Sequence, residues 1–231
     1  MIGGYIVKMM KKISIISVMF VTIFVLSGCF NQQTPEEQLY DVLEKAVDLE
    51  KDFENQQDPL LDLENEEKEL YNQIISLGMK EYDKIVQLSK QAIEIVDKRK
   101  DLMEKENDSI LSAKKEFEKM KPILEKIEDE NNKKLGEKLY DTMMDRYDAH
   151  EKLYEKYMEG LSYDRELYEM FQNKDLSMKD LQSQIEKINQ TYEEVIKANQ
   201  VFNDTTNQYN QDKMEFYEEA NLNIEIENNE K

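Results

Sequence analysis

Hydrophobic residues recur at steps of three and four along most of the chain, which is the pattern of amphipathic helices. Four such stripes cover residues 39–77, 82–127, 140–171 and 181–220. A helix with one apolar face is not stable alone in water, so these helices must pack together. The sustained spacing favours shallow crossing angles. It therefore predicts an all-α fold, an elongated, antiparallel, left-handed bundle of three to four long helices.

The number of helices depends on Gly78, where the apolar stripe shifts by one position. If the chain forms a hairpin there, the result is an up-and-down four-helix bundle, and the matched segment lengths favour this interpretation. If Gly78 lies inside one very long helix, the result is a spectrin-like three-helix bundle. The lack of polar loop residues around Gly78 favours that alternative, so both remain open.

Capping and breaking residues predict where the helices begin and end. Thr34 is an expected N-cap, and a polar turn at 172–176 precedes a second expected cap at Ser177. The polar run 128–133 predicts a loop. Pro59 lies within the first stripe, where its missing N–H predicts a kink or a brief restart of the helix capped by Asp58.

The first 28 residues predict a signal peptide. Three lysines and no acidic residue accompany an apolar run at 13–26, which is too short to span a membrane comfortably. The run ends in a pattern that resembles the lipobox of bacterial lipoproteins, with Cys29 as the lipidation site after Leu26, Ser27 and Gly28. Met10 offers an alternative start. We expect a lipid-anchored tether at 29–35, a single helical-bundle domain at 36–220 and a flexible tail at 221–231.

The predicted anchor places the protein outside the cytoplasm, on the outer face of the cell membrane. Two or three acyl chains on Cys29 give stable membrane attachment. Removal of the signal peptide changes the formal net charge from −20 to −23, because it takes away three lysines. Nucleic acid is excluded as a partner, since its phosphates require a basic surface.

The chain offers little catalytic or metal-binding chemistry. Di-iron bundles need a Glu-x-x-His motif on each of two helices, and His150 is the only histidine. It lies within an apolar stripe, which predicts a hydrogen-bonded core residue. Arg99 and Glu106 are polar interruptions of the second stripe. With no nucleophile motif, we expect no enzyme activity, no metal and no cofactor.

Six tyrosines lie between residues 140 and 168. Most of them fall on heptad positions shared with Leu161, Met143 and Phe171, which predicts packing in the core. The alternative is a row of aromatic rings that stacks on sugars. Under that alternative, the candidate glycan contacts are Tyr147, Tyr154 and Tyr163.

The helical stretches resemble the YkyA-type family of cell-wall-binding lipoproteins from low-GC Gram-positive bacteria. The resemblance covers about 34–220 and depends on PEEQLYDVLEKAVDLEKDFE at 35–54, LYNQIISLGMKEYDKI at 70–85, KKEFEKMKPILEKIED at 114–129 and YEEVIKANQVFN at 192–203. It implies a location in the cell envelope, with peptidoglycan or another envelope protein as the partner. We therefore expect a non-enzymatic interaction or scaffold module, with glycan binding as the alternative.

Overall fold

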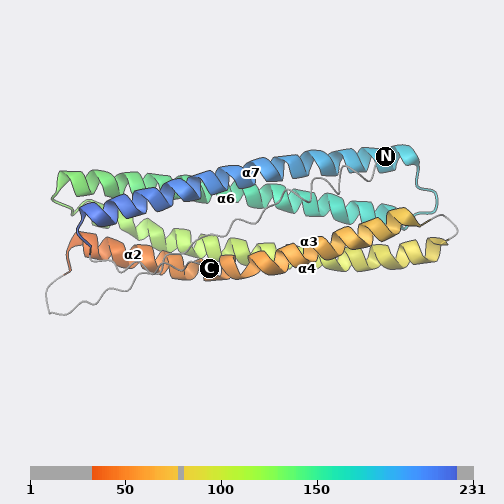
Figure 1. The fold of residues 1–231 in the computed structure, drawn as a ribbon, viewed down its shortest axis with the longest axis horizontal. Coiled ribbons are helices and arrows are strands. Elements are labelled where there is room, and N and C mark those ends of the chain that lie inside the picture. Colours follow the sequence, from red (N-terminus) through yellow and green to blue (C-terminus); the bar gives the residue numbers. More distant parts are fainter. Residues whose placement is uncertain (1–32, 78–80, 223–231) are drawn as a thin grey trace. The chain divides into compact units, whose positions relative to one another are not determined.

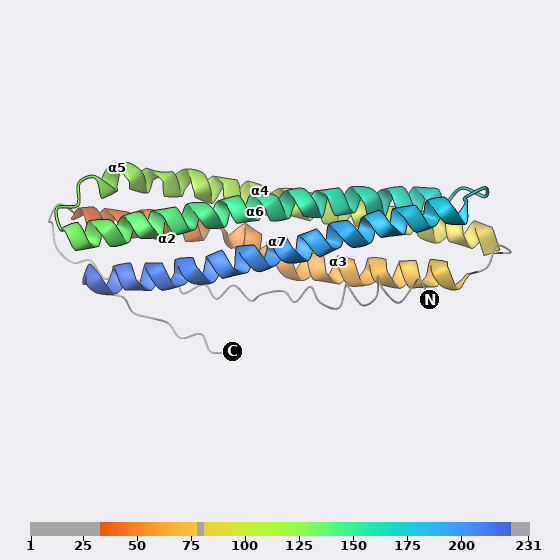
Figure 2. The same ribbon diagram turned by 90° about the horizontal axis from the view of Figure 1, so that it is seen from above.

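The computed structural model describes residues 33–77 and 81–222. Throughout these two ranges the regular structure is helical and contains no strand, which confirms the all-α prediction. Within each of the units described below, the helices lie side by side (Figures 1 and 2). The elements are α2 (Pro35–Leu49), α3 (Lys51–Ser76), α4 (Tyr82–Phe117), the 3₁₀ helix η2 (Glu118–Met120), α5 (Lys121–Leu124), α6 (Glu130–Met170) and α7 (Met178–Glu219).

The number of long helical segments follows from the end of α3. The helix stops at Ser76, and α4 begins only at Tyr82, so the chain does not continue as one helix past Gly78. With α2 and α3 forming one segment in sequence, the others are α4, α6 and α7. The four-helix interpretation is confirmed, and Gly78 itself lies outside the described residues.

The described residues form two compact units, each assembled from separate stretches of the chain. Unit 1 comprises 55–107 and 151–200, and unit 2 comprises the described parts of 16–54, 108–150 and 201–231. Helices α4, α6 and α7 contribute residues to both units. The prediction of a single domain from 36 to 220 remains a prediction.

Both predicted N-caps are confirmed. The Thr34 hydroxyl accepts from the Glu37 N–H at 3.2 Å, while the Glu37 carboxylate accepts from the Thr34 N–H at 2.9 Å. This reciprocal capping box begins α2. Ser177 likewise accepts from the N–H of Asp180 at 3.1 Å at the start of α7. Both pairs satisfy backbone donors that the first helical turn leaves free.

The prediction of a helix restart at Asp58–Pro59 was wrong, and the alternative of a kink there stays a prediction. Helix α3 runs through Pro59, and the helical break lies at Glu50 between α2 and α3. A proline removes only one backbone hydrogen bond, and the buried residues on either side of it keep the helix packed. The break at Glu50 accompanies a buried ion pair formed by the Glu50 side chain, which local sequence does not reveal.

The loop predicted at 128–133 was too long. Helix α6 begins at Glu130, because Asp129 Oδ1 accepts from the N–H groups of Asn131 and Asn132 at 2.9 Å each. An acidic residue followed by two asparagines is typical of a loop, but here it starts a helix. The turn at 172–176 is confirmed between α6 and α7.

Each unit has its own apolar core. In unit 1, α3, α4, α6 and α7 bury a cluster that includes Tyr71, Val96, Leu161 and Ile188. In unit 2, α2 packs against η2 and α5. Gly136 of α6 allows a close approach in that unit, since a Cβ there would lie 2.5 Å from Leu124 Cδ2.

The predicted signal peptide, the lipobox residues Leu26, Ser27 and Gly28, and the lipidation site Cys29 all lie outside the described residues. They therefore remain predictions. Of the helices in 33–77 and 81–222, none is sufficiently long and apolar to pass through a bilayer.

Candidate functional site: two buried arginine clusters

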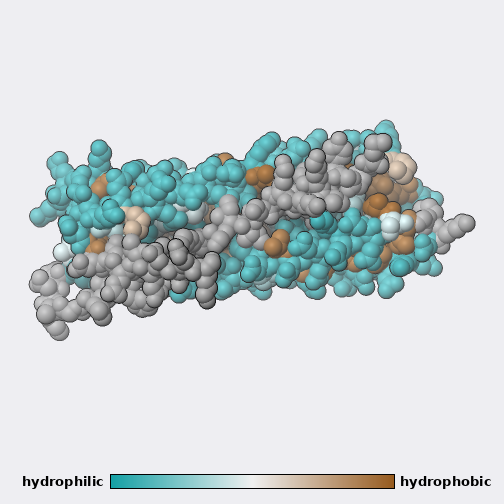
Figure 3. Space-filling model, in the orientation of Figure 1, coloured by the Kyte–Doolittle hydropathy of each residue, from teal (hydrophilic) through white to brown (hydrophobic). Residues whose placement is uncertain are grey.

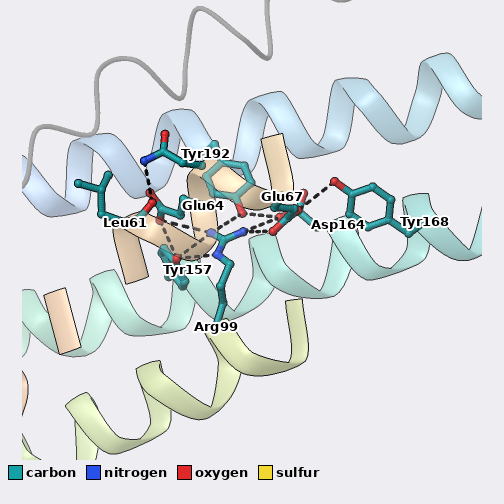
Figure 4. Close-up of polar contacts among 9 residues, drawn as sticks. Leu61, Glu64, Glu67, Arg99, Tyr157, Asp164, Tyr168 and Tyr192 are labelled. Carbon is teal, nitrogen blue, oxygen red and sulfur yellow. Dashed lines mark hydrogen bonds and ion pairs between the residues drawn. The ribbon is translucent and has the colours of Figure 1, made fainter. Parts of the chain in front are cut away.

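The most concentrated polar chemistry of unit 1 surrounds Arg99 of α4 (Figure 4). Its guanidinium group contacts two carboxylates of α3: Nη1 donates to Glu67 Oε2 at 2.5 Å, and Nη2 lies 3.4 Å from Glu64 Oε1. A third carboxylate, Asp164 of α6, lies 3.6 Å from Nη1. All four side chains are buried. One cation therefore faces three acidic groups away from water.

Three tyrosine hydroxyls complete this cluster. Tyr157 accepts from Arg99 Nε at 3.0 Å and from Nη2 at 2.6 Å, and it donates to Glu64 Oε1 at 2.7 Å. Tyr168 donates to Glu67 Oε1 at 3.1 Å. Tyr192 of α7 donates to Asp164 Oδ2. The Arg99 cluster thus joins α3, α4, α6 and α7 through side chains alone, as Figure 4 shows.

Burial, together with neighbouring negative charge, changes the protonation of Asp164. Burial, with a further contribution from the Glu67 carboxylate, raises the pKa of Asp164 to about 8, although Arg99 acts in the opposite direction. Burial alone would lower the pKa of Arg99, but Tyr157, Tyr192 and Glu67 raise it well above its usual value. The guanidinium group stays charged, and Asp164 keeps its proton at neutral pH.

A carboxyl group with a pKa near neutrality can act as a general acid or base when a substrate reaches it. Here Arg99, Glu64, Glu67 and Asp164 are each more than nine-tenths buried and are bonded to one another. The arrangement instead satisfies polar groups inside a bundle. In the part of the chain that the structure describes, no group of three or more His, Cys, Asp or Glu side chains is arranged to hold a metal ion.

Unit 2 contains a second buried arginine, Arg146 of α6. It binds Glu50 in bidentate fashion, with Nη1 and Nη2 each 2.8 Å from a carboxylate oxygen. Its Nε donates to Thr206 at 3.0 Å, and its guanidinium carbon lies 4.9 Å from the centre of the Phe202 ring. We call Arg146 and Glu50 the Arg146 pair. Here one cation faces one carboxylate, so the charges balance.

His150 is a core residue, as predicted. It is buried in unit 2, where its ring lies 5.8 Å from that of Phe53 and 5.5 Å from that of Phe202, in edge-on geometry. Such edge-to-face contacts are favourable between buried rings. Its position suits packing among aromatic side chains.

The three candidate glycan contacts lie in different surroundings. Tyr147 is only 2% exposed and packs edge-on against Phe117, so burial disfavours its assignment as a sugar contact, which stays a prediction. Tyr154 and Tyr163 are half-buried against the core of unit 1. The Tyr163 hydroxyl donates to Glu159 at 3.2 Å. These two tyrosines remain candidates.

Sequence reasoning identified Arg99 only as an interruption of an apolar stripe, and it missed the cluster around it. A usable signal exists: Glu67, Arg99 and Asp164 all fall on stripe positions of predicted helices. A charged residue on a buried stripe requires a partner of opposite charge. Three such residues on three helices therefore indicate a shared polar cluster, although not which atoms meet.

Comparison with known proteins finds a matching family, a similar lipoprotein and a solved structure with a similar fold. Residues 34–219 match the YkyA family, described as "Putative cell-wall binding lipoprotein". An uncharacterized lipoprotein, YkyA of Bacillus subtilis (strain 168), is 35% identical over 200 residues, which cover 87% of this chain and 89% of the relative. A conserved Staphylococcus aureus protein of unknown function, solved by crystallography, has a similar fold with a TM-score of 0.57 at 13% identity. That match covers 81% of this chain and 97% of the other.

Proposed function

Because the chain belongs to the YkyA family of lipoproteins, we propose that it is a non-enzymatic interaction or scaffold module, held on the outer face of the cell membrane by a lipid on Cys29. One observation carries this proposal: the Leu26-Ser27-Gly28-Cys29 pattern directly precedes the helical region that the family matches, residues 34–219. The anchor and the helical region thus adjoin in sequence, with only a short tether between them.

The structure supports the non-enzymatic part of the proposal through the Arg99 cluster. The titratable groups with the most unusual surroundings are buried and form hydrogen bonds with one another. The proposed envelope partner is peptidoglycan or a second envelope protein, and the description of the family as cell-wall binding supports a location at the wall. The mature charge of −23 makes attraction to polyanions such as teichoic-acid-like polymers unfavourable.

The test of the anchor is a Cys29→Ser variant of the full chain. We expect it to leave the membrane fraction or to remain unprocessed, since acyl chains supply the strong membrane affinity. Ser27→Ala is the matched control, because it keeps a small residue beside the cleavage site. Membrane retention of a Cys29→Ser protein that is still cut before residue 29 would contradict the proposal.

Glycan binding is the second candidate, and the partial exposure of Tyr154 and Tyr163 favours it. Under this alternative, Tyr163→Ala should reduce co-sedimentation with purified peptidoglycan while hardly changing the unfolding temperature. Tyr140→Ala serves as a comparison variant at another half-buried tyrosine. Equal sedimentation of both variants and the parent protein would exclude a sugar site at Tyr163.

A further inference from the structure

A pocket of about 350 Å³ lies at one end of unit 1. It is formed where α3 ends, α4 begins and the 171–177 loop leads into α7. Its wall is mainly apolar, with contributions from Ile74, Ile85, Phe171 and Leu181. Pockets that bind small organic molecules typically measure about 300–1,000 Å³ and have such walls.

Exposed apolar side chains border this pocket. Ile75 is 45% exposed and Met178 is 68% exposed, and both line it. Figure 3 shows hydrophobic surface at this end of the unit. Leu111 and Val201 are the other large hydrophobic residues found exposed among the described ones, and neither lines the pocket. Apolar surface is therefore gathered at a concave site on an otherwise strongly charged chain.

Two polar side chains of the lining, Tyr71 and Lys174, have no hydrogen-bond or ion-pair partner among the described residues. The Tyr71 hydroxyl is buried and makes no hydrogen bond within the described structure. Lys174 lies 4.7 Å from the centre of the Tyr82 ring, and no carboxylate of the described residues comes within 4.0 Å of its ammonium group. A buried donor without an acceptor is costly. The Lys174 ammonium group is therefore open to an anionic ligand, and it stands beside an apolar wall.

A mainly apolar wall with a single cationic side chain, Lys174, matches a particular chemical class. We propose that this pocket binds a fatty acid, with the acyl chain among Ile74, Phe171 and Leu181 and the carboxylate at Lys174. A carboxylate complements the ammonium group of Lys174 in charge, and it can accept more than one hydrogen bond. A folded protein partner fits less well, because a stable interface buries about 800 Å² on each side, far more than this pocket offers.

The experiment is photolabelling of the full chain in isolated membranes with a diazirine-bearing stearic acid. Labelled peptides are then mapped by mass spectrometry. We expect light-dependent labelling in 70–77 and 171–185, with competition by unlabelled oleic acid. Ile75→Glu should lower this labelling by about tenfold or more, because its carboxylate would have to lose water when the acyl chain binds. Val201→Glu is the matched control at an exposed aliphatic residue outside the pocket.

The head group is tested with Lys174→Gln and a diazirine-bearing fatty alcohol of equal length. The variant should lose labelling by the acid and keep labelling by the alcohol, because only the acid carries a charge for Lys174. Circular dichroism checks that each variant is folded. The proposal is overturned if Ile75→Glu and Val201→Glu label alike, or if Lys174→Gln affects both probes equally. Protein recovered from the medium can be labelled in the same way, so the result does not depend on the anchor at Cys29.

Discussion

Arg99 in unit 1 and Arg146 in unit 2 are both buried guanidinium groups, but they face different numbers of carboxylates. Arg146 binds one, Glu50, through two parallel hydrogen bonds of 2.8 Å. Arg99 faces three and depends on tyrosine hydroxyls to complete its surroundings. The Arg146 pair is neutral as built. The Arg99 cluster approaches neutrality only by holding a proton, and this makes its contribution to stability depend on pH around neutrality.

The largest expected effect comes from removing each arginine. Arg146→Met leaves Glu50 buried without its partner and should reduce the free energy of unfolding by about 3–5 kcal/mol. Arg99→Met should cost more, because the carboxylates of Glu64 and Glu67 are then left buried beside Asp164 without a cation. Urea unfolding followed by circular dichroism measures both.

A double substitution sharpens this comparison. Adding Glu50→Leu to Arg146→Met removes both charges of the pair and should recover much of the lost stability, since apolar replacement of a whole ion pair is often neutral. Adding Glu67→Leu to Arg99→Met should recover little, as Glu64 and Asp164 remain. Equal recovery in the two units would mean that Glu64 and Asp164 do not lower the free energy of unfolding when Arg99 is absent.

The second prediction concerns pH. Folded Asp164 has a pKa of about 8 against an ordinary 3.8, so between these values the folded state binds a proton that the unfolded state has released. Stability should therefore fall as pH rises through this window, by up to about 1.4 kcal/mol per pH unit, and should level off above it. Asp164→Asn should remove this slope and be more stable than the parent protein at pH 8.

Asp212 in unit 2 is the control with the opposite sign. Burial alone would raise its pKa, but hydrogen bonds from Thr142, Lys138 and Gln208 outweigh this and lower it. Its contribution to stability is present at neutral pH and is lost as pH falls through the lowered pKa. Asp212→Asn should thus be destabilising at pH 7, and this penalty should shrink as pH falls through the lowered pKa of Asp212. Parallel pH profiles for the two variants would refute the contrast.

The helices of both units could be predicted from sequence, whereas the two arginine clusters could not. Helix existence follows from a local period, since residues three and four apart share a face. The contacts of Arg99 join residues 32 to 93 positions apart, among 51 acidic side chains that look alike in sequence. The sequence marked Arg99 as anomalous, but only the packed helices show which carboxylates reach it.

The same distinction explains the two boundary errors. Pro59 is a strong local signal for a break, yet α3 continues through it, because packing on both sides outweighs one missing hydrogen bond. The actual break at Glu50 has no local signal: it lies where a buried carboxylate meets Arg146 from a distant helix. Likewise, the tyrosine row was predicted as core from its heptad spacing, and Tyr147, Tyr157 and Tyr168 are buried.

The third prediction compares tyrosine hydroxyls. Tyr157→Phe removes hydrogen bonds to Arg99 and Glu64 and should cost about 1.5–3 kcal/mol, the range for bonds to charged groups. Tyr209 in unit 2 is also buried, but its hydroxyl has no hydrogen-bond partner in the described structure. Tyr209→Phe should therefore be neutral or slightly stabilising. A comparable loss in both variants would show that the phenol rings, and not the hydroxyls, decide the effect.

The smallest expected effect belongs to Arg165, the remaining arginine of the chain. It lies in unit 1, like Arg99, and forms ion pairs with Asp97 and with Glu169, the latter at 3.2 Å between Nε and Oε1. All three side chains are about half exposed to water. Solvent screens such pairs, so Arg165→Met should cost only about 0.2–1 kcal/mol. In about 1 M salt, where screening acts over about 3 Å, even this loss should nearly vanish. The penalty of Arg99→Met should persist there, because salt does not reach a buried cluster. If the two penalties fell together with added salt, the Arg99 cluster would have to be open to solvent.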